Sequence, residues 1–116
     1  MAINRRPLDE IVKFFGPAKS AAMIAKVPAT LDAHMALIER TPGDAIGPLA
    51  HKLKGLAAMY GLDELAAAAL RLERDEVVAA ELPAALNQLG ALVCVAKKEL
   101  QAFVSELGRV GGSGAA

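Results

Sequence analysis

Apolar residues between Leu82 and Leu107 recur alternately four and three positions apart, a spacing that few folds can use. The series is Leu82, Leu86, Leu89, Val93, Ala96, Leu100, Phe103 and Leu107. This is the a/d pattern by which one long helix packs along others with a left-handed crossing. Pro83 and Gly108 frame the segment, which as a helix would be about 39 Å long at 1.5 Å per residue. We therefore predict an all-α fold: an antiparallel up-down four-helix bundle with a short N-terminal capping helix.

The rest of the sequence divides into helical segments at its proline and glycine positions. We predict, in chain order, a flexible arm over residues 1–7, the capping helix over 8–15, helices over 17–40, 41–61, 62–74 and 82–107, and a flexible tail over 109–116, with the bundle domain spanning 8–108. Phe14 and Phe15 lead us to expect that the first helix closes one end of the bundle. Pro28 means that the helix over 17–40 either kinks or breaks at Lys26-Val27. Thr41-Pro42 favours a helix start, and Gly61 favours a left-handed helix end.

Composition narrows the possible function classes. The 116 residues suffice for one domain with a single core. Thirteen basic residues balance thirteen acidic ones, so no net field draws the chain to nucleic acid or to an anionic membrane. The sequence shows no signal peptide and no uninterrupted apolar run of about 18 residues that would span a bilayer. Its one cysteine, Cys94, cannot form an internal disulfide. We expect a soluble cytoplasmic protein.

The segment 49–61 places one histidine apart from the apolar residues around it. At about 100° per residue, the apolar side chains of this predicted helix fall within one sector, whereas His51 points nearly the opposite way. The residues of that sector are Ile46, Leu49, Ala50, Leu53, Ala57 and Tyr60. Gly47, Gly55 and Ala58 lie around His51 on the outer face, with Lys54 at its edge. Since a helical glycine costs about 1 kcal/mol relative to alanine, these small residues indicate that another molecule approaches the imidazole.

The motif Ala50-His51-Lys52-Leu53-Lys54-Gly55, followed by Gly61 and then by Leu72-Glu73, resembles the signature of histidine-containing phosphotransfer (Hpt) domains. The resemblance extends from Leu8 to Leu107. Hpt domains are small helical bundles that relay phosphoryl groups between receiver domains in two-component signalling. The resemblance therefore implies a phosphorelay protein whose partners are the receiver domains of hybrid histidine kinases and response regulators.

The same resemblance implies roles for individual residues. His51 would be the phosphoacceptor, Lys54 would contact the phosphoryl oxygens one turn away, and Glu73, 22 positions after the histidine, would contact its Nδ1. The partner-docking face would comprise Gly47, Lys52, Gly55 and Ala58. The aspartate that exchanges the phosphoryl group and the Mg²⁺ ion would both belong to the receiver domain, so this chain would bind no cofactor or metal of its own.

The chemistry of phosphoryl transfer fits these residue types. A neutral imidazole has one bare ring nitrogen that can attack phosphorus while the other carries the proton. A carboxylate that accepts from Nδ1–H keeps Nε2 bare and stabilises the cationic ring formed on phosphorylation. A cation assists because the transferring group spreads negative charge over three oxygens. The sequence has no Walker-type or kinase glycine loop and no acidic cluster with His51, so we expect no kinase activity of its own.

Three interpretations stay open at the level of sequence. The first is a monomeric phosphocarrier that uses His51. The second is a non-catalytic interaction module on the same bundle, which binds a receiver domain or a helix while His51 is never modified. The third is the dimerisation and phosphoacceptor bundle of a histidine kinase, although such bundles have their histidine in a different local pattern. His34 has no comparable glycine and lysine context and is interpreted as an ordinary residue.

Overall fold

The computed structural model describes residues 3–74 and 77–115, with side chains described through Arg109. All regular elements in these ranges are helical, which confirms the predicted all-α class. They are α1 (Arg5–Phe15), α2 (Pro17–Ala25), α3 (Val27–Glu39), the 3₁₀ turn η1 (Gly43–Ala45), α4 (Ile46–Met59), α5 (Asp63–Glu73), the 3₁₀ turn η2 (Ala79–Glu81) and α6 (Leu82–Ala115).

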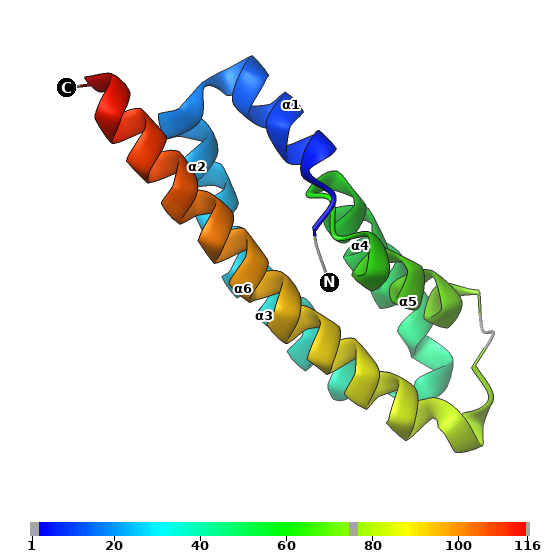
Figure 1. The fold of residues 1–116 in the computed structure, drawn as a ribbon. Helices are drawn as coiled ribbons and strands as arrows, with labels where there is room; N and C mark the ends of the chain where they lie inside the picture. The colour runs from blue at the N-terminus through cyan, green and yellow to red at the C-terminus, as the bar shows by residue number, and fades with distance from the viewer. Residues whose placement is uncertain (1–2, 75–76, 116) are drawn as a thin grey trace.

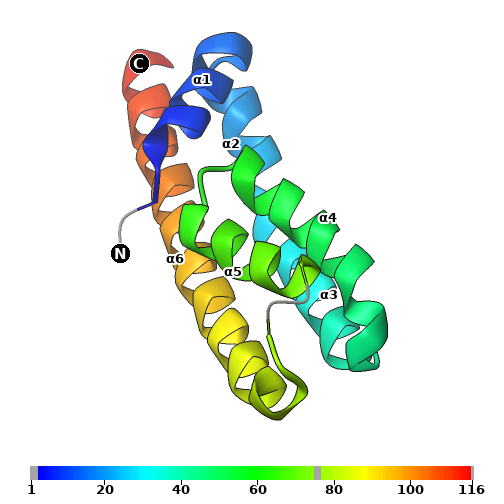
Figure 2. The same ribbon diagram turned by 90° about the vertical axis from the view of Figure 1, so that its right-hand side faces the viewer.

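Helix α6 determines the shape of the molecule, which measures 56 × 22 × 19 Å. Helices α2 and α3 follow one another along α6 in the opposite chain direction (Figure 1). Helices α4 and α5 form a hairpin that packs on α3 and α6 at one end of the molecule (Figure 2). Helix α1 packs on α2 beyond the end of that hairpin (Figure 1). The hairpin is thus held on the rest of the bundle with its outer side open.

The core lies between the helices where the apolar periodicity predicts it. On α6 the seam from Leu89 to Leu107 is buried, and Leu82 and Leu86 are partly buried against it. On α2 and α3 the buried apolar side chains are Ile24, Val27, Leu31, Met35 and Ile38. These two apolar faces meet in the α2–α6 and α3–α6 contacts, so the predicted inward faces are confirmed.

The helix predicted over residues 17–40 is interrupted at Lys26 and does not continue through Pro28 as one kinked helix. Helix α2 ends at Ala25 and α3 begins at Val27, with Pro28 buried in the first turn of α3. Proline has no N–H to donate to the preceding turn, and its ring crowds that turn, which favours a helix start at this point. Of the two alternatives for this region, the structure therefore shows the break.

Two helix starts differ from the prediction. Helix α1 begins at Arg5, not at Leu8, because the Asn4 side chain accepts a hydrogen bond from Arg6 N–H and caps it; Arg5 to Pro7 are therefore helical and not part of a loose arm. Thr41 does not cap the next helix. Its hydroxyl donates to the Leu37 carbonyl at the end of α3 (2.7 Å), and after Pro42 the chain makes η1 before α4 begins at Ile46.

Helix α6 is longer than predicted, and the phenylalanines of α1 do not pack into the core. Helix α6 runs from Leu82 through Ala115, past the end at residue 107 that the apolar spacing predicts. In α1 the buried anchor is Leu8, whereas Phe14 is 82 % exposed. The phenylalanine pair therefore does not close the core.

Two helical segments, Pro17–Glu39 and Ala79–Arg109, are long and apolar enough to cross a membrane by length and composition alone. Core helices of soluble proteins meet the same criterion. Here the two segments direct their apolar faces toward each other in the bundle.

Candidate functional site

Helix α4 presents His51 to solvent because its opposite face is occupied by the core. Ile46, Ala50, Leu53 and Ala57 are buried, whereas the His51 side chain is 63 % exposed. This is the orientation that the helical periodicity predicts. The imidazole is therefore anchored on a well-packed helix and open to an approaching molecule.

The end of α4 is fixed by a glycine turn that directs α5 back alongside it. Gly61 has φ +74°, and the N–H groups of Gly61 and Leu62 donate to the carbonyls of Ala58 and Ala57. This hydrogen-bond pattern is the Schellman motif, which favours glycine at the left-handed position, so the predicted left-handed end is confirmed. The turn sets the register of the hairpin and brings the last residue of α5, Glu73, level with His51.

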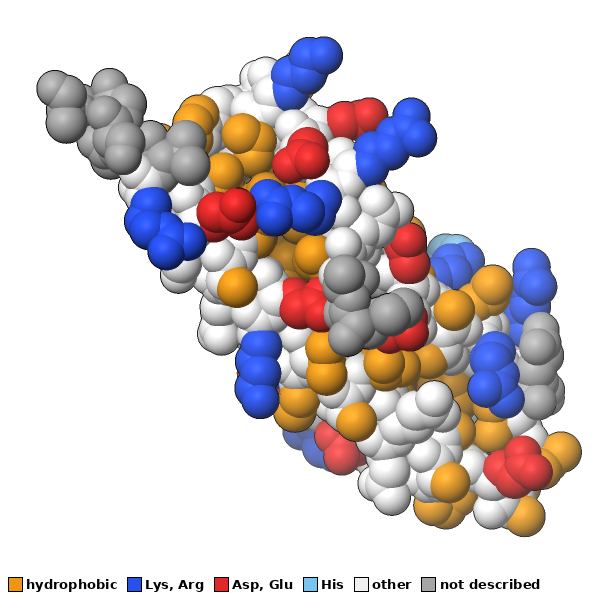
Figure 3. Space-filling model, viewed as in Figure 1, with side chains coloured by type: hydrophobic (Ala, Val, Ile, Leu, Met, Phe, Trp, Pro, Cys, Tyr) orange, Lys and Arg blue, Asp and Glu red, His pale blue; other side chains and the backbone are white. Residues whose placement is uncertain are grey.

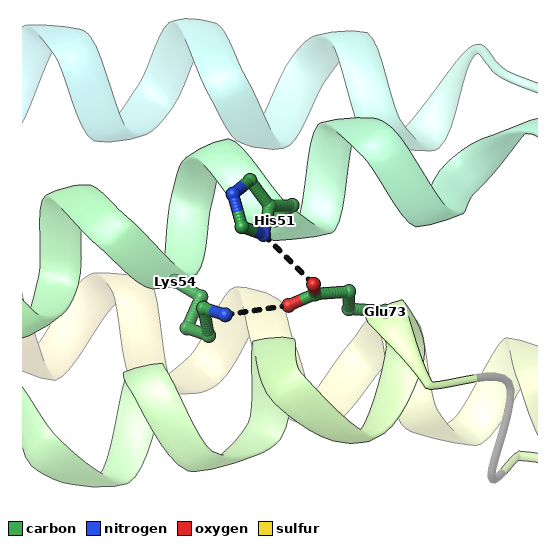
Figure 4. Close-up of polar contacts among 3 residues, drawn as sticks. All are labelled: His51, Lys54 and Glu73. Carbon is green, nitrogen blue, oxygen red and sulfur yellow. Dashed lines mark hydrogen bonds and ion pairs between the residues drawn. The ribbon is translucent and has the colours of Figure 1, made fainter.

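Glu73 contacts both His51 and Lys54 (Figure 4). Its Oε2 lies 2.7 Å from His51 Nδ1, and its Oε1 lies 2.8 Å from Lys54 Nζ. Oε1 is enclosed from solvent, and the Lys54 ammonium is its charged partner. One carboxylate thus connects a histidine and a lysine one turn apart on the neighbouring helix.

The ionisation of Glu73 sets the tautomer of the histidine. The hydrogen bond from Lys54, and after it the one from His51, lower the pKa of the Glu73 carboxyl, against an opposing effect of burial. An ionised carboxylate only accepts hydrogen bonds, so the neutral His51 ring carries its proton on Nδ1 and donates it to Oε2. Nε2 is then the bare nitrogen, on the side of the ring away from Nδ1 (Figure 4).

The other predicted site residues lie on or beside the outer face of α4. Lys52 and Ala58 are exposed, and a Cβ atom added at Gly55 would meet nothing within 4 Å. Gly47 differs, because a Cβ there would lie 3.7 Å from the Glu73 carbonyl oxygen, in ordinary contact with the end of α5. Gly55 is therefore the glycine beside His51 with open space above it.

Two features of the site were not predicted. The ion pair between Lys54 and Glu73 was not predicted from the sequence. Met59 at the end of α4 was not assigned to the outer face, and it is 60 % exposed. At 100° per residue it lies about 80° around the helix from His51, which would have placed it at the edge of that face. Among residues 3–74 and 77–109, no group of three or more His, Cys, Asp or Glu side chains is placed to hold a metal ion.

The fold and this geometry define a class of protein: a helical bundle that exposes one histidine with its Nδ1 held by a carboxylate. The sequence matches the family described as "Hpt domain" over residues 21–109. The chain belongs to the Hpt domain family, which confirms the resemblance, and membership implies involvement in phosphorelay signalling. Hpt domains interact with receiver domains in phosphorelays. Comparisons with curated proteins and with solved structures gave no match.

Proposed function

We propose that this protein is a phosphocarrier in which His51 Nε2 exchanges a phosphoryl group with the aspartate of a partner receiver domain. The Nε2 lone pair attacks the phosphorus of the aspartyl phosphate, so that a nitrogen–phosphorus bond forms. The phosphorus–oxygen bond to the aspartate breaks, and its electron pair leaves with the carboxylate. The ring becomes cationic with the proton still on Nδ1, and transfer to a second receiver reverses each step. The observation that supports this proposal is the 2.7 Å contact from Nδ1 to Glu73, which leaves Nε2 bare on an exposed ring.

Glu73 acts as a positioning residue in this proposal. Before transfer its carboxylate keeps the proton on Nδ1, and after transfer its negative charge stabilises the cationic ring. Because the contact is short and charge-assisted, it also restricts rotation of the imidazole. Glu73 thus favours the same ring orientation in both states.

Lys54 supplies positive charge to the phosphoryl group. Its ammonium is 2.8 Å from Glu73 Oε1, on a flexible four-carbon stem, and its side chain is 29 % exposed. As negative charge arrives at Nε2, one turn away on the same helix, the ammonium can turn from the carboxylate toward the phosphoryl oxygens. In the resting protein Glu73 keeps that cation at the site.

The proposal extends to the bundle arrangement, the oligomeric state and the compartment. We propose that α2–α3, α4, α5 and α6 form the up-down bundle, within a domain over residues 8–108. We also propose that the protein is a cytoplasmic monomer and that the receiver supplies both aspartate and Mg²⁺. Acidic and basic side chains alternate over the face seen in Figure 3, and the formal net charge is zero, which gives no support to binding of nucleic acid or an anionic membrane. Sedimentation as a dimer would instead favour the kinase-type bundle.

The test uses receiver domains from the source organism, phosphorylated with a radioactive phosphoryl group. We expect label to move to the wild-type chain and to His34→Gln, which alters the half-buried histidine on α3, but not to His51→Gln. The label should be acid-labile and alkali-stable, as a nitrogen–phosphorus bond requires. Equal labelling of the two variants would overturn the assignment. Receiver binding without any labelling would favour the non-catalytic interaction module.

A further inference from the structure

A groove lies between the start of α5 and the middle of α6, beside the N-terminal segment (Figure 1). Its volume is about 150 Å³, and a cavity of that volume inside another protein holds one benzene molecule. Its walls are mostly apolar and are formed by Ile3, Leu62, Leu65, Leu92, Val95 and Ala96. Among the described residues that line the groove, none belongs to α4. The groove therefore has room for one aromatic or branched apolar side chain and is separate from the face that carries His51.

One wall of the groove is fixed by hydrogen bonds of the N-terminal segment. Asn4 N–H donates to the Gly61 carbonyl (2.9 Å), and Asn4 Nδ2 donates to Asp63 Oδ2 (3.0 Å). Gly61 has no Cβ atom, so the Asn4 carbonyl can lie directly against it. A site that is formed before binding loses less conformational entropy when its ligand arrives. The groove is thus a preorganised feature of the fold.

Three carboxylates line the groove, those of Asp63, Glu64 and Glu99. The first two lie in the first turn of α5, where the helix dipole favours acidic side chains. Glu99 lies in the interior of α6, so the dipole does not explain it. The ion pairs among the described residues include none of these three side chains. Uncompensated negative charge beside an apolar groove complements a ligand that combines apolar and basic groups.

A second hollow continues from the groove along α6. It shares Ile3 and Glu99 with the groove, and its walls also include Ala102 and Phe103. Leu92 and Phe103, at the two ends of this surface, are eleven positions apart, which corresponds to about 16 Å along the helix axis. A helix of about 11 residues or an extended segment of about five covers that length. The surface therefore suits a short peptide segment better than a single small molecule.

We propose that the groove between α5 and α6 binds a short basic segment of another protein. One aromatic or branched apolar side chain of that segment fits the hollow, and its Lys or Arg side chains pair with Glu64 and Glu99. Because the groove and His51 lie on different faces, this partner and a receiver domain can bind at the same time. The inference goes beyond the proposed function and does not depend on it.

The experiment selects peptides from a phage-displayed library of random 12-residue sequences on the 116-residue chain. We expect the enriched peptides to combine an aromatic or branched apolar residue with at least two Lys or Arg residues. For the tightest of them, Glu64→Gln/Glu99→Gln should raise Kd about tenfold and weaken its dependence on salt. Val95→Ala, which shortens an apolar wall at a side chain that is 43 % exposed, should raise Kd about fivefold.

The matched control is Glu39→Gln/Glu81→Gln. It removes the same number of negative charges from two exposed side chains that do not line the groove. The Kd of the selected peptide should stay at the wild-type value in this variant. Urea unfolding of every variant shows whether it is folded. Phosphoryl transfer from a phosphorylated receiver to His51 should be equal with and without saturating peptide.

Several results would overturn the proposal. These are no enriched peptide, enrichment of peptides without basic residues, and an equal rise in Kd in the control variant. Inhibition of phosphoryl transfer by the peptide would place it on the face around His51 instead. Self-association of the chain that Glu64→Gln/Glu99→Gln abolishes would make a second copy the occupant. A failure of the proposed function is distinguishable, because receivers would then leave His51 unlabelled while the Kd comparison still gives its answer.

Discussion

Replacement of Gly55 tests whether the outer face of α4 is kept clear for function at the expense of stability. Gly55 lies in the interior of α4, is exposed, and has open space where a Cβ atom would be. Because alanine is favoured over glycine in a helix interior by about 1 kcal/mol, Gly55→Ala should raise the free energy of unfolding by about that amount. For a domain of this size, Tm should rise by about 4 °C.

A longer side chain at the same position should separate stability from transfer. Glutamine is also a better helix former than glycine, so Gly55→Gln should again be more stable than wild type. Its side chain, however, leans toward the preceding turn, where His51 lies four residues earlier. It would occupy the space through which the partner's aspartyl phosphate reaches Nε2. Since a displacement of about 1 Å can reduce a reaction about 100-fold, transfer should fall at least that far.

The assay combines urea unfolding with the rate of transfer from a phosphorylated receiver. The matched control is Gly90→Gln on α6, where a Cβ atom also meets nothing within 4 Å. It should be stabilised like Gly55→Gln and transfer at the wild-type rate. Transfer by Gly55→Gln at the wild-type rate would refute the idea that this face is cleared for a partner. A loss of stability in Gly55→Ala would show instead that the fold itself needs the glycine.

Three further predictions concern Glu73, Lys54 and Gly61. The pKa of Glu73 is lowered in the folded protein, so its contribution to stability is present above the ordinary glutamate pKa and is lost as the pH falls through the lowered value. Glu73→Gln should therefore flatten the acid side of a curve of unfolding free energy against pH, measured by urea unfolding. An unchanged curve would contradict the ion-pair geometry. Lys54→Ala should raise the pKa of Glu73 toward its ordinary value, which NMR titration of the carboxyl carbon measures. The same variant should slow phosphoryl transfer to His51. An unchanged rate of transfer would show that Lys54 only pairs with Glu73 and does not act on the phosphoryl group. Gly61→Ala should reduce the free energy of unfolding by about 2–3 kcal/mol. One part is the cost of an alanine in the left-handed conformation. The other is the backbone hydrogen bond from Asn4 N–H to the Gly61 carbonyl, which is lost because the new Cβ would overlap the Asn4 carbonyl oxygen. An unfolding free energy equal to that of wild type would contradict both contributions.

The periodicity of the sequence predicted which residues face the core and which face solvent. Most buried residues of α6, α3 and α4 are those that the four-and-three spacing and the 100° wheel select; Pro28 is buried in addition, and Leu49, Leu82 and Leu86 are only partly buried. This works because helix geometry is local: the direction of each side chain follows from its position along one regular element. Helix ends were less predictable. Asn4 caps α1 and Thr41 hydrogen-bonds backward to Leu37, and the same residue types could have made other local hydrogen bonds.

For the site, the sequence by itself determined that His51 faces outward among small residues, because this depends only on the period of α4. The Hpt resemblance, and not the periodicity, indicated Glu73. Only the tertiary structure decided that the glycine turn at Gly61 aligns α5 with α4, so that Glu73 holds His51 Nδ1 and Lys54 together. The physical reason is that these contacts join side chains on two helices, and their distances depend on the register of the hairpin, which no single helix encodes.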